Sequence, residues 1–347
     1  MVLAWALVAA VLGGCGQETP VYTSRFTAFG SLIDLNVVGV DEATAQRVSA
    51  EIEADFKYLH YDWHAWDPGP LGYLNQTLPT GGAVAAPPSV LPMIRLGQKL
   101  SDASENLFNP AIGKLVELWG FHTDSPECLP PPPAARIQKL VKAAPKMGDL
   151  TVEGIYVTSS NPAVKLDFGA FGKGYGIDLA IEHLRSLGIR NAMINAGGDL
   201  RVIGDRAGQP WRIPLRRASG HGVMAILEVS GDESVFTSAG YQRNFVYEGR
   251  TYHHIIDPRT GYPADDSQSV TVIHTDAVTA DAAATALFVA GPEDWVRIAE
   301  RMGIAFVMLV DSAGTVHMTP PMAERVQMLE PNVQILVSPP LGAAPRR

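Results

Sequence analysis

Residues 166–175 read LDFGAFGKGY, and this stretch decides how the chain around it folds. The apolar run at 163–166 predicts a strand that delivers Asp167, and the glycines after it allow another group to approach the backbone closely. A helix is predicted from about Gly174 to Ser186, and the apolar run at 191–195 predicts the next strand. A strand, a glycine-rich loop and a helix therefore succeed one another at the centre of the sequence.

Outward from this centre, predicted strands and helices occur in mixed runs. Toward the C-terminus we expect a β-rich stretch at 200–257, a strand at 269–274, helices at 280–289 and 292–302, and strands at 305–310 and 315–318. Toward the N-terminus we expect a strand pair at 26–38, a helix capped by Asp41, a shaped loop at 60–75, helices at 87–100, 109–119 and 134–145, and a strand at 151–157. This order, without a fixed repeat, favours an α+β fold over regular βαβ alternation.

Composition excludes several classes of protein. The 347 residues are 46% hydrophobic and 18% charged, which is too apolar for a disordered chain and too poor in charge for a coiled coil. The net charge of −9 disfavours a protein that tracks a nucleic-acid backbone, so no nucleic-acid partner is predicted.

The N-terminus indicates export. Residues 2–12, VLAWALVAAVL, are too few to span a bilayer as a helix, which takes about 20 residues, and they match the apolar region of a secretory signal. Gly13, Gly14 and Cys15 follow, and this pattern resembles a bacterial lipoprotein signal in which Cys15 is acylated. The alternative is a buried N-terminal helix with Cys15 as a small apolar side chain. Lipidation of Cys15 would leave Cys128 without an intramolecular disulfide partner.

Two glycine-rich segments carry candidate ligand-binding groups. Backbone N–H groups at the start of a helix together with the ammonium of Lys173 would make a phosphate cradle beside Asp167, although the glycines also suit a tight structural turn. The second segment, NAGGD at 195–199, ends in Asp199. Paired glycines before an acid either line a ligand groove or form an ordinary hairpin turn.

Two further segments lie closer to the C-terminus. Residues 237–243 read TSAGYQR and residues 253–261 read HHIIDPRTG, where the two adjacent histidines point to opposite faces of a strand and cannot readily share a metal. In TADAAAT, Asp281 and Thr285 lie one helical turn apart and present two hard oxygen ligands suited to Mg²⁺. Helix capping by Asp281 is the alternative without a metal.

With these four segments in this order behind a lipoprotein-like signal, the chain resembles the FAD:protein FMN transferases, the ApbE-like flavin transferases, over residues 24–320. Agreement extends to Phe29-Gly30-Ser31, where the family has Met-Gly-Thr, and to the segments LN at 74–75, LFNPAIG at 107–113 and LWGF at 118–121. HIIDPRTG and ADAAATALF are the most specific matches. Besides Phe29, Phe168 and Phe171 depart from the family pattern and are expected to make the Asp167 loop bulkier.

The resemblance implies a two-lobed α+β fold with mixed and antiparallel sheets, peripheral helices and a flavin nucleotide site between the lobes. It further implies Mg²⁺-dependent transfer of the FMN half of FAD to a Thr or Ser hydroxyl of a target protein, with a phosphoester product and release of AMP. The residues implied for Mg²⁺ are Asp281, Thr285 and the carbonyl of Ala170; those implied for FAD are Phe29, Leu107, Phe108, Asn109, Asp167, Lys173 and Ile255, with Asn75 and Asp199 as further candidates. His254 would orient or deprotonate the acceptor hydroxyl, and Asp281 is the second candidate catalytic residue.

Two other functions stay open from the residues. The same site with water as the acceptor would hydrolyse FAD to FMN and AMP, and a lipid-anchored flavin-binding protein would need no catalysis. We expect a signal peptide at 1–14, a tether at 15–23, the transferase domain at 24–320 and a mobile tail at 331–347. The expected location is the extracytoplasmic side of a bacterial envelope membrane, with target flavoproteins of respiratory or redox complexes as partners.

Overall fold

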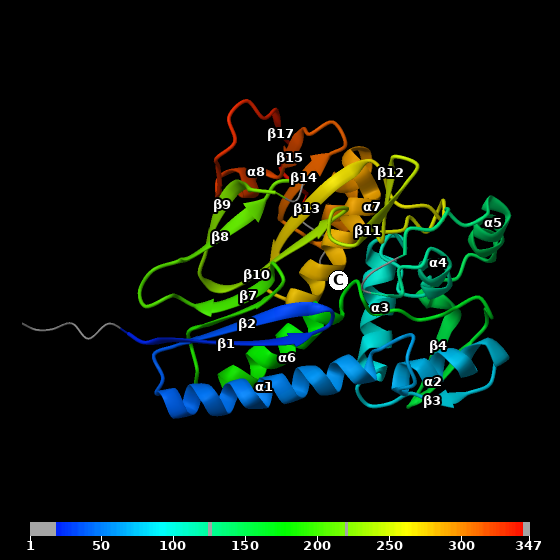
Figure 1. The fold of residues 1–347 in the computed structure, drawn as a ribbon, viewed down its shortest axis with the longest axis horizontal. Helices are drawn as coiled ribbons and strands as arrows, with labels where there is room; N and C mark the ends of the chain where they lie inside the picture. Colours follow the sequence, from blue (N-terminus) through cyan, green and yellow to red (C-terminus); the bar gives the residue numbers. More distant parts are fainter. Residues whose placement is uncertain (1–18, 124–126, 219–220, 343–347) are drawn as a thin grey trace, which may run out of the picture.

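The structure is a computed structural model that describes residues 19–123, 127–218 and 221–342 (Figure 1). The predicted signal peptide at 1–14, the acylation site Cys15 and residues 16–18 of the tether lie outside the described residues. Within the described residues, no helix is both long and apolar enough to cross a membrane.

One large sheet organises the molecule. Its strand order is β1-β2-β6-β7-β10-β13-β14-β15-β17, and neighbouring strands are antiparallel except for the β15–β17 pair. The strands are β1 Val21–Ala28, β2 Ser31–Val38, β6 Ala192–Ala196, β7 Asp199–Gly204, β10 Gly231–Ala239, β13 Ser267–His274, β14 Phe306–Asp311, β15 Val316–Met318 and β17 Ile335–Val337. Together with the helices, this sheet confirms the predicted α+β class.

Both faces of the large sheet bury apolar side chains. Three helices pack on one face, namely α1 (Glu42–Asp62), α6 (Gly172–Ser186) and α7 (Ala277–Met302). A three-stranded sheet in the order β16-β9-β8 packs on the other, with β8 at Trp211–Arg216, β9 at Val223–Val229 and β16 at Val326–Met328. The residues of β2 show the division, because Ile33, Leu35 and Val37 pack with the helices whereas Val38 belongs to the second core.

A smaller helical region lies beside this sheet (Figure 1). It contains the helices α2 Pro70–Thr77, α3 Leu91–Ala103, α4 Gly113–Leu118 and α5 Ala134–Ala143, the 3₁₀ turns Leu78–Thr80 and Met147–Asp149, and a sheet of β3 Val84–Ala85, β5 Tyr156–Ser159 and β4 Leu150–Glu153. The hairpin of β11 (Asn244–Tyr247) and β12 (Arg250–His253) packs against α4 and α5 through a separate apolar core, and the short helix α8 (Pro320–Ala323) lies near the C-terminus. The predicted division into two lobes stays a prediction.

Local signals placed several elements correctly. The strand pair at 26–38 is the β1–β2 hairpin, and Asp41 caps α1 by accepting a hydrogen bond from the backbone N–H of Thr44 at 2.8 Å. The predicted helices at 280–289 and 292–302 form the single element α7, kinked at Gly291, whose φ of 69° lies in the left-handed region.

Other expectations about elements were wrong. The segment 60–75 is not one shaped loop, because α1 continues to Asp62 and Pro70 begins α2 at a position where a missing N–H costs nothing. The helix expected at 109–119 covers only α4, since Asn109 accepts a hydrogen bond from the N–H of Ala111 and donates one to the Pro145 carbonyl.

Two stretches of expected strand or tail also differ from the structure. The strand predicted at 163–166 is reduced to one isolated bridge between Lys165 and Ile112. Residues 335–337, predicted to belong to a mobile tail, are instead strand β17, which pairs with β15 because that strand otherwise leaves its backbone groups at the sheet edge.

Candidate functional site

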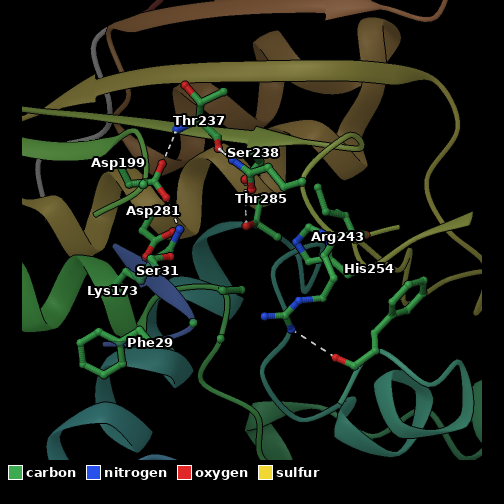
Figure 2. Close-up of a pocket in the computed structure, with 18 of the residues that line it drawn as sticks. Phe29, Ser31, Lys173, Asp199, Thr237, Ser238, Arg243, His254, Asp281 and Thr285 are labelled. Atoms are coloured by element: carbon green, nitrogen blue, oxygen red, sulfur yellow. Dashed lines mark hydrogen bonds and ion pairs between the residues drawn. The ribbon is translucent and has the colours of Figure 1, made fainter. Parts of the chain in front are cut away.

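A cavity of about 790 Å³ opens between the helical region and one end of the large sheet. Its volume suits a nucleotide-sized ligand. Among the parts of the chain that line it are residues 29–31, the end of α1, the segment 107–112, residues within 116–122, the loop 167–173, the turn 197–199, strand β8, the segment 237–243, the segment 254–256, and Asp281 with Thr285 on α7. The four chemistry-bearing segments of the sequence therefore meet at one site (Figure 2).

The inner end of the cavity is built where the N-termini of α6 and α7 cross. The backbone N–H of Gly174 donates to Oδ2 of Asp281 at 2.9 Å. A Cβ at position 174 would lie 2.5 Å from the carbonyl oxygen of Ala277, so only glycine allows the two helices this close. The glycine after Lys173 thus serves helix packing, and it brings Asp281 to the start of α6.

Lys173, whose side chain is 20% exposed, forms an ion pair with the buried Asp199 at this crossing (Figure 2). Asp199 also accepts a hydrogen bond from the backbone N–H of Thr237 at 3.0 Å. Burial alone would lower the pKa of Lys173, but the charges of Asp199 and Asp281 outweigh it and raise that pKa. Lys173 is therefore a fixed ammonium ion on the cavity wall, next to two carboxylates.

Asp281 is only 6% exposed, and burial raises the pKa of its carboxyl to about 8 against the opposing effect of Lys173. One turn further along α7, Oγ1 of Thr285 lies 3.2 Å from Oγ of Ser238. A buried carboxylate with too little positive charge around it favours a bound cation. Across residues 19–123, 127–218 and 221–342, no three His, Cys, Asp or Glu side chains gather as a metal cluster. The donors available here are one carboxylate, a hydroxyl and backbone carbonyls, a set that suits Mg²⁺ better than Zn²⁺.

A second carboxylate holds the start of α7 in place. Asp178 on α6 accepts hydrogen bonds from the backbone N–H groups of Ala277 at 2.9 Å and Val278 at 3.0 Å, and it pairs with the buried Arg201. Asp276, the N-cap residue of α7, makes no capping bond with its own side chain. Asp178 therefore caps α7 from another helix.

His254 lines the cavity opposite these groups. Its Nδ1 lies 3.2 Å from the carbonyl oxygen of Arg243. Because a carbonyl oxygen only accepts, Nδ1 carries the hydrogen and Nε2 keeps a lone pair. Burial and, after it, the charge of Arg243 lower the pKa of His254 to about 3, so the ring is neutral near pH 7. His253 is turned away and reaches the carbonyl of Ala264, as expected for adjacent strand residues.

An aromatic wall closes another side of the cavity. Phe29 occupies the left-handed region with a φ of 51°, and its ring stacks on Trp63 at 5.8 Å between centroids. Asp167 lines the same cavity and accepts the N–H of Gly169 at 2.9 Å, while burial raises the pKa of its carboxyl. Leu107, Asn109 and Ile255, which the resemblance implies for FAD, and Ala170, which it implies for Mg²⁺, also line the cavity, and their ligand contacts stay predictions.

Two predicted ligand contacts lie behind the wall instead. Asn75 is buried and exchanges two hydrogen bonds with the backbone of Leu166, so it fixes the segment that delivers Asp167. Phe108 is fully buried and packs edge-on against Phe171 at 5.2 Å. Phe168 and Phe171 are buried as well, so the extra bulk of this loop fills the core rather than widening the loop.

Several groups at the site have no sequence prediction behind them. Thr237, Ser238 and Arg243 belong to the quoted TSAGYQR segment, but nothing local in that segment reveals which side chains face a ligand. His60 and Trp63 lie at the end of α1, and helical periodicity accounts for them without a site. Asp178 has no motif around it at all, because the backbone N–H groups that it caps are about a hundred residues away.

Fold and site together define a class, namely an α+β protein with a deep polar cavity where two helix N-termini meet. The model of the ApbE family matches residues 29–308, and the chain belongs to this family. A curated relative from Rhodobacter capsulatus, named FAD:protein FMN transferase, is 42% identical over 90% of this chain and 59% of its own length. A relative of the same name from Klebsiella pneumoniae is 34% identical over 80% of this chain and 85% of its own length. The chain thus spans about three fifths of the Rhodobacter relative.

Solved structures agree with this assignment. The crystal structure of an ApbE protein from Thermotoga maritima has a TM-score of 0.81 at 29% identity, over 88% of this chain and 99% of that chain. The apo form of a flavinyl transferase ApbE from Pseudomonas stutzeri has a TM-score of 0.77 at 28% identity, over 89% of this chain and 98% of that chain.

Proposed function

We propose that this chain is a FAD:protein FMN transferase, which moves the FMN half of FAD to a Thr or Ser hydroxyl of a target protein. The observation that carries the proposal is the buried Asp281 carboxylate beside Thr285 and Lys173, at the crossing of two helix N-termini inside a nucleotide-sized cavity. The curated relatives reported above bear the name of this activity.

The proposed reaction breaks one bond and forms another. The acceptor oxygen attacks the phosphorus on the FMN side of the pyrophosphate, the bond from that phosphorus to the bridging oxygen breaks, and AMP leaves with the electron pair. The hydroxyl proton passes to a base. Such an attack needs neutralisation of phosphate charge more than covalent help from the enzyme. Lys173 supplies one fixed positive charge, and N–H groups at the start of α6 supply partial ones.

Mg²⁺ is the proposed cofactor. Asp281, Thr285 and the carbonyl of Ala170 would hold it, and all three residues line the cavity. When bound, the ion would neutralise charge on the pyrophosphate. Asp281 would then have a second positive neighbour besides Lys173, which by itself does not offset the effect of burial on the Asp281 carboxyl.

His254 is the proposed base. Its Nε2 lone pair is available because Nδ1 is committed to the carbonyl of Arg243. The low pKa makes the free imidazole a weak base, and the negative charge of bound FAD would raise that pKa.

The targets and the location belong to the same proposal. The acceptors would be flavoproteins of respiratory or redox complexes. The protein would be anchored to a bacterial envelope membrane by a lipid on Cys15 and would act on the extracytoplasmic side.

A transfer assay tests the function directly. Purified mature protein is incubated with FAD, Mg²⁺ and a segment of a candidate respiratory flavoprotein, and the segment is weighed by mass spectrometry. We expect a mass gain equal to bound FMN, with one AMP released per modified chain. Free FMN and AMP with an unmodified segment, across a panel of segments, would instead identify a FAD hydrolase. Bound FAD without any AMP would identify a flavin-binding protein.

A further inference from the structure

A second cavity, of about 570 Å³, lies at the opposite end of β8 from the first one. Trp211, Arg212 and Ile213 line it from β8, and Asn36 and Met193 line it from the large sheet. The first cavity is lined by the remainder of β8, from Ile213 to Arg216. Strand β8 therefore runs from one cavity to the other, with Ile213 in both walls.

The outer edge of β8 has no pairing strand in the described part of the chain, because β8 is the last strand of the β16-β9-β8 sheet. Its side chains alternate regularly. Trp211, Ile213 and Leu215 are buried in the core below, whereas Arg212, Pro214 and Arg216 are exposed. An exposed strand edge is a template for an incoming extended segment. Pro214 removes one N–H from β8, which limits such pairing to a short stretch.

The exposed side chains along this edge are positively charged. Arg206 lines the second cavity and Arg216 the first, and neither has an ion-pair partner within the described residues. Arg212 lies 3.6 Å from Glu228, but both side chains are more than half exposed, so that pair is weak. Arg206 and Arg212 line the second cavity with a single acidic residue, Glu228, and Arg216 lines the first, so on a chain of net charge −9 these arginines form a local attraction for negative charge.

We propose that the outer edge of β8 docks an extended, acidic segment of the protein that receives the flavin, and guides its acceptor hydroxyl into the first cavity. The proposal rests on the transferase function above and names the recognition surface for its protein substrate. Arg216 lies four residues beyond Arg212, which spans about 13 Å of strand at roughly 3.3 Å per residue. A segment whose acceptor residue lies near Arg216 would therefore place acidic residues four or more positions away beside Arg212, and Arg206 lines the same cavity as Arg212.

Peptide binding tests the proposal. The probes are fluorescein-labelled peptides of 14 residues, each with one Thr. Two Asp residues lie four to six positions away from this Thr, on its N-terminal side in one peptide and on its C-terminal side in the other. A twin of each peptide has Asn in place of both Asp residues and is the neutral probe. Fluorescence anisotropy is measured with FAD-loaded protein, with the variant Arg206→Glu/Arg212→Glu, and with the control Arg136→Glu, an exposed arginine on α5. We expect one Asp peptide to bind at least tenfold tighter than its Asn twin. The double variant should lose this preference and should bind a twin peptide with Lys in place of Asp more tightly. The control variant should keep the preference for Asp.

Three readouts separate the outcomes. Hydrogen exchange should show amide protection within residues 211–216 when the acidic peptide binds. Equal binding of Asp and Asn peptides, no binding up to 1 mM, or an unaffected double variant would each overturn the docking site. If the wild type elutes as a dimer on size exclusion and the double variant as a monomer, without a change in peptide binding, the edge would be assigned to a second copy of the chain and the docking site would be overturned as well. AMP release from FAD is measured in parallel: acidic-peptide binding without any AMP release would sustain the docking surface and reject the transferase function.

Discussion

At the scale of single residues, the ion pair of Lys173 and Asp199 is expected to contribute both to folding stability and to the binding of a phosphate-containing ligand. Asp199 is buried and Lys173 is partly buried, and Asp199 also accepts a hydrogen bond from the backbone N–H of Thr237. Truncating one partner of a buried pair leaves the other charge unpaired, which costs more than the pair itself contributes.

We therefore predict that Lys173→Met lowers the free energy of unfolding by about 3 kcal/mol and weakens FAD binding as well. The double variant Lys173→Met/Asp199→Asn should recover most of the stability but not the affinity, because only the phosphate partner is then missing. Urea denaturation and flavin fluorescence titration measure the two quantities. Lys57→Met, which removes an exposed pair with Glu53 at 2.6 Å, is the control and should cost less than about 1 kcal/mol. Equal destabilisation by the single and double variants would contradict the prediction.

Substitution of Asp281 distinguishes its proposed role in metal binding from a role in capping a helix. Asp281→Asn keeps an acceptor for the N–H of Gly174 and removes a carboxylate whose pKa is raised to about 8, so folding stability should stay within about 1 kcal/mol. Binding of Mn²⁺, used as a spectroscopic probe by electron paramagnetic resonance, should weaken more than tenfold, and AMP release should be nearly abolished. Thr285→Ala should do less damage and recover at high Mg²⁺. Near-normal AMP release by Asp281→Asn at low Mg²⁺ would reject the metal assignment.

His254 gives a pH dependence with a defined sign. Its pKa is about 3 in the folded protein and about 6.5 in the unfolded chain, so the unfolded state binds more protons between these values. The contribution of the neutral His254 ring to the free energy of unfolding is fully present above about pH 6.5 and is lost as the pH drops toward 3. Between pH 7.5 and 5.5 this single group should cost on the order of 1 kcal/mol. In urea denaturation, His254→Gln should abolish this fall in the free energy of unfolding at low pH. The control His122→Gln, at an exposed histidine, should leave the fall unchanged. An unchanged pH slope in His254→Gln would count against a buried neutral imidazole.

At the scale of elements, the crossing of α6 and α7 determines where the ligand-binding groups lie. Gly174 permits the contact, and Asp178 holds the first turn of α7 through two backbone N–H groups. Asp281 and Thr285 follow on the next turns of the same helix. The position of the site therefore depends on a residue that the cavity does not contain.

We predict that Asp178→Ala lowers the free energy of unfolding by about 3 kcal/mol. The substitution leaves two helix N–H groups without an acceptor and removes one carboxylate partner of the buried Arg201. Asp178→Asn should cost less, since an amide oxygen still accepts. Mn²⁺ affinity should fall in the alanine variant. The matched control is Asp276→Ala, at the formal N-cap whose side chain makes no capping bond, which should change stability by less than about 0.5 kcal/mol. Equal effects at the two positions would show that α7 does not need Asp178.

At the scale of the whole molecule, one sheet with two covered faces supports the cavity at one end of its strands. Helices bury one face and the β8–β9–β16 sheet buries the other, so the loops at the strand ends carry the site on a rigid base. No helix in the described part of the chain is both long and apolar enough to cross a membrane.

We predict that Cys15→Ser releases the protein from membranes or leaves an unprocessed precursor, because the acylated thiol is the proposed anchor. Cell fractionation followed by mass spectrometry of the N-terminus measures both. Cys128→Ser, at the exposed cysteine of the described chain, is the control and should fractionate like the wild type. A Cys15→Ser protein that is processed and stays in the membrane would refute the lipid anchor.

The sequence alone determined the features that neighbouring residues encode. The β1–β2 hairpin, the Asp41 cap of α1, helix α6 and the candidate groups Asp167, Lys173, Asp281 and Thr285 were predicted because periodicity, capping and motif spacing act over a few residues, whereas the role of His254 was implied only by the family resemblance. Where the segment 60–75 or the helix at 109–119 was misjudged, competing turn signals and one side-chain bond from Asn109 decided the outcome.

Only the tertiary structure decided which groups act together. The bond from Gly174 to Asp281 joins residues 107 positions apart, and the bond from Ala277 to Asp178 joins residues 99 apart. The free edge of β8 and the pairing of β17 likewise follow from sheet order rather than from local pattern. A chain specifies such contacts through the packing of whole elements, so their partners carry no signature in their own neighbourhood of the sequence.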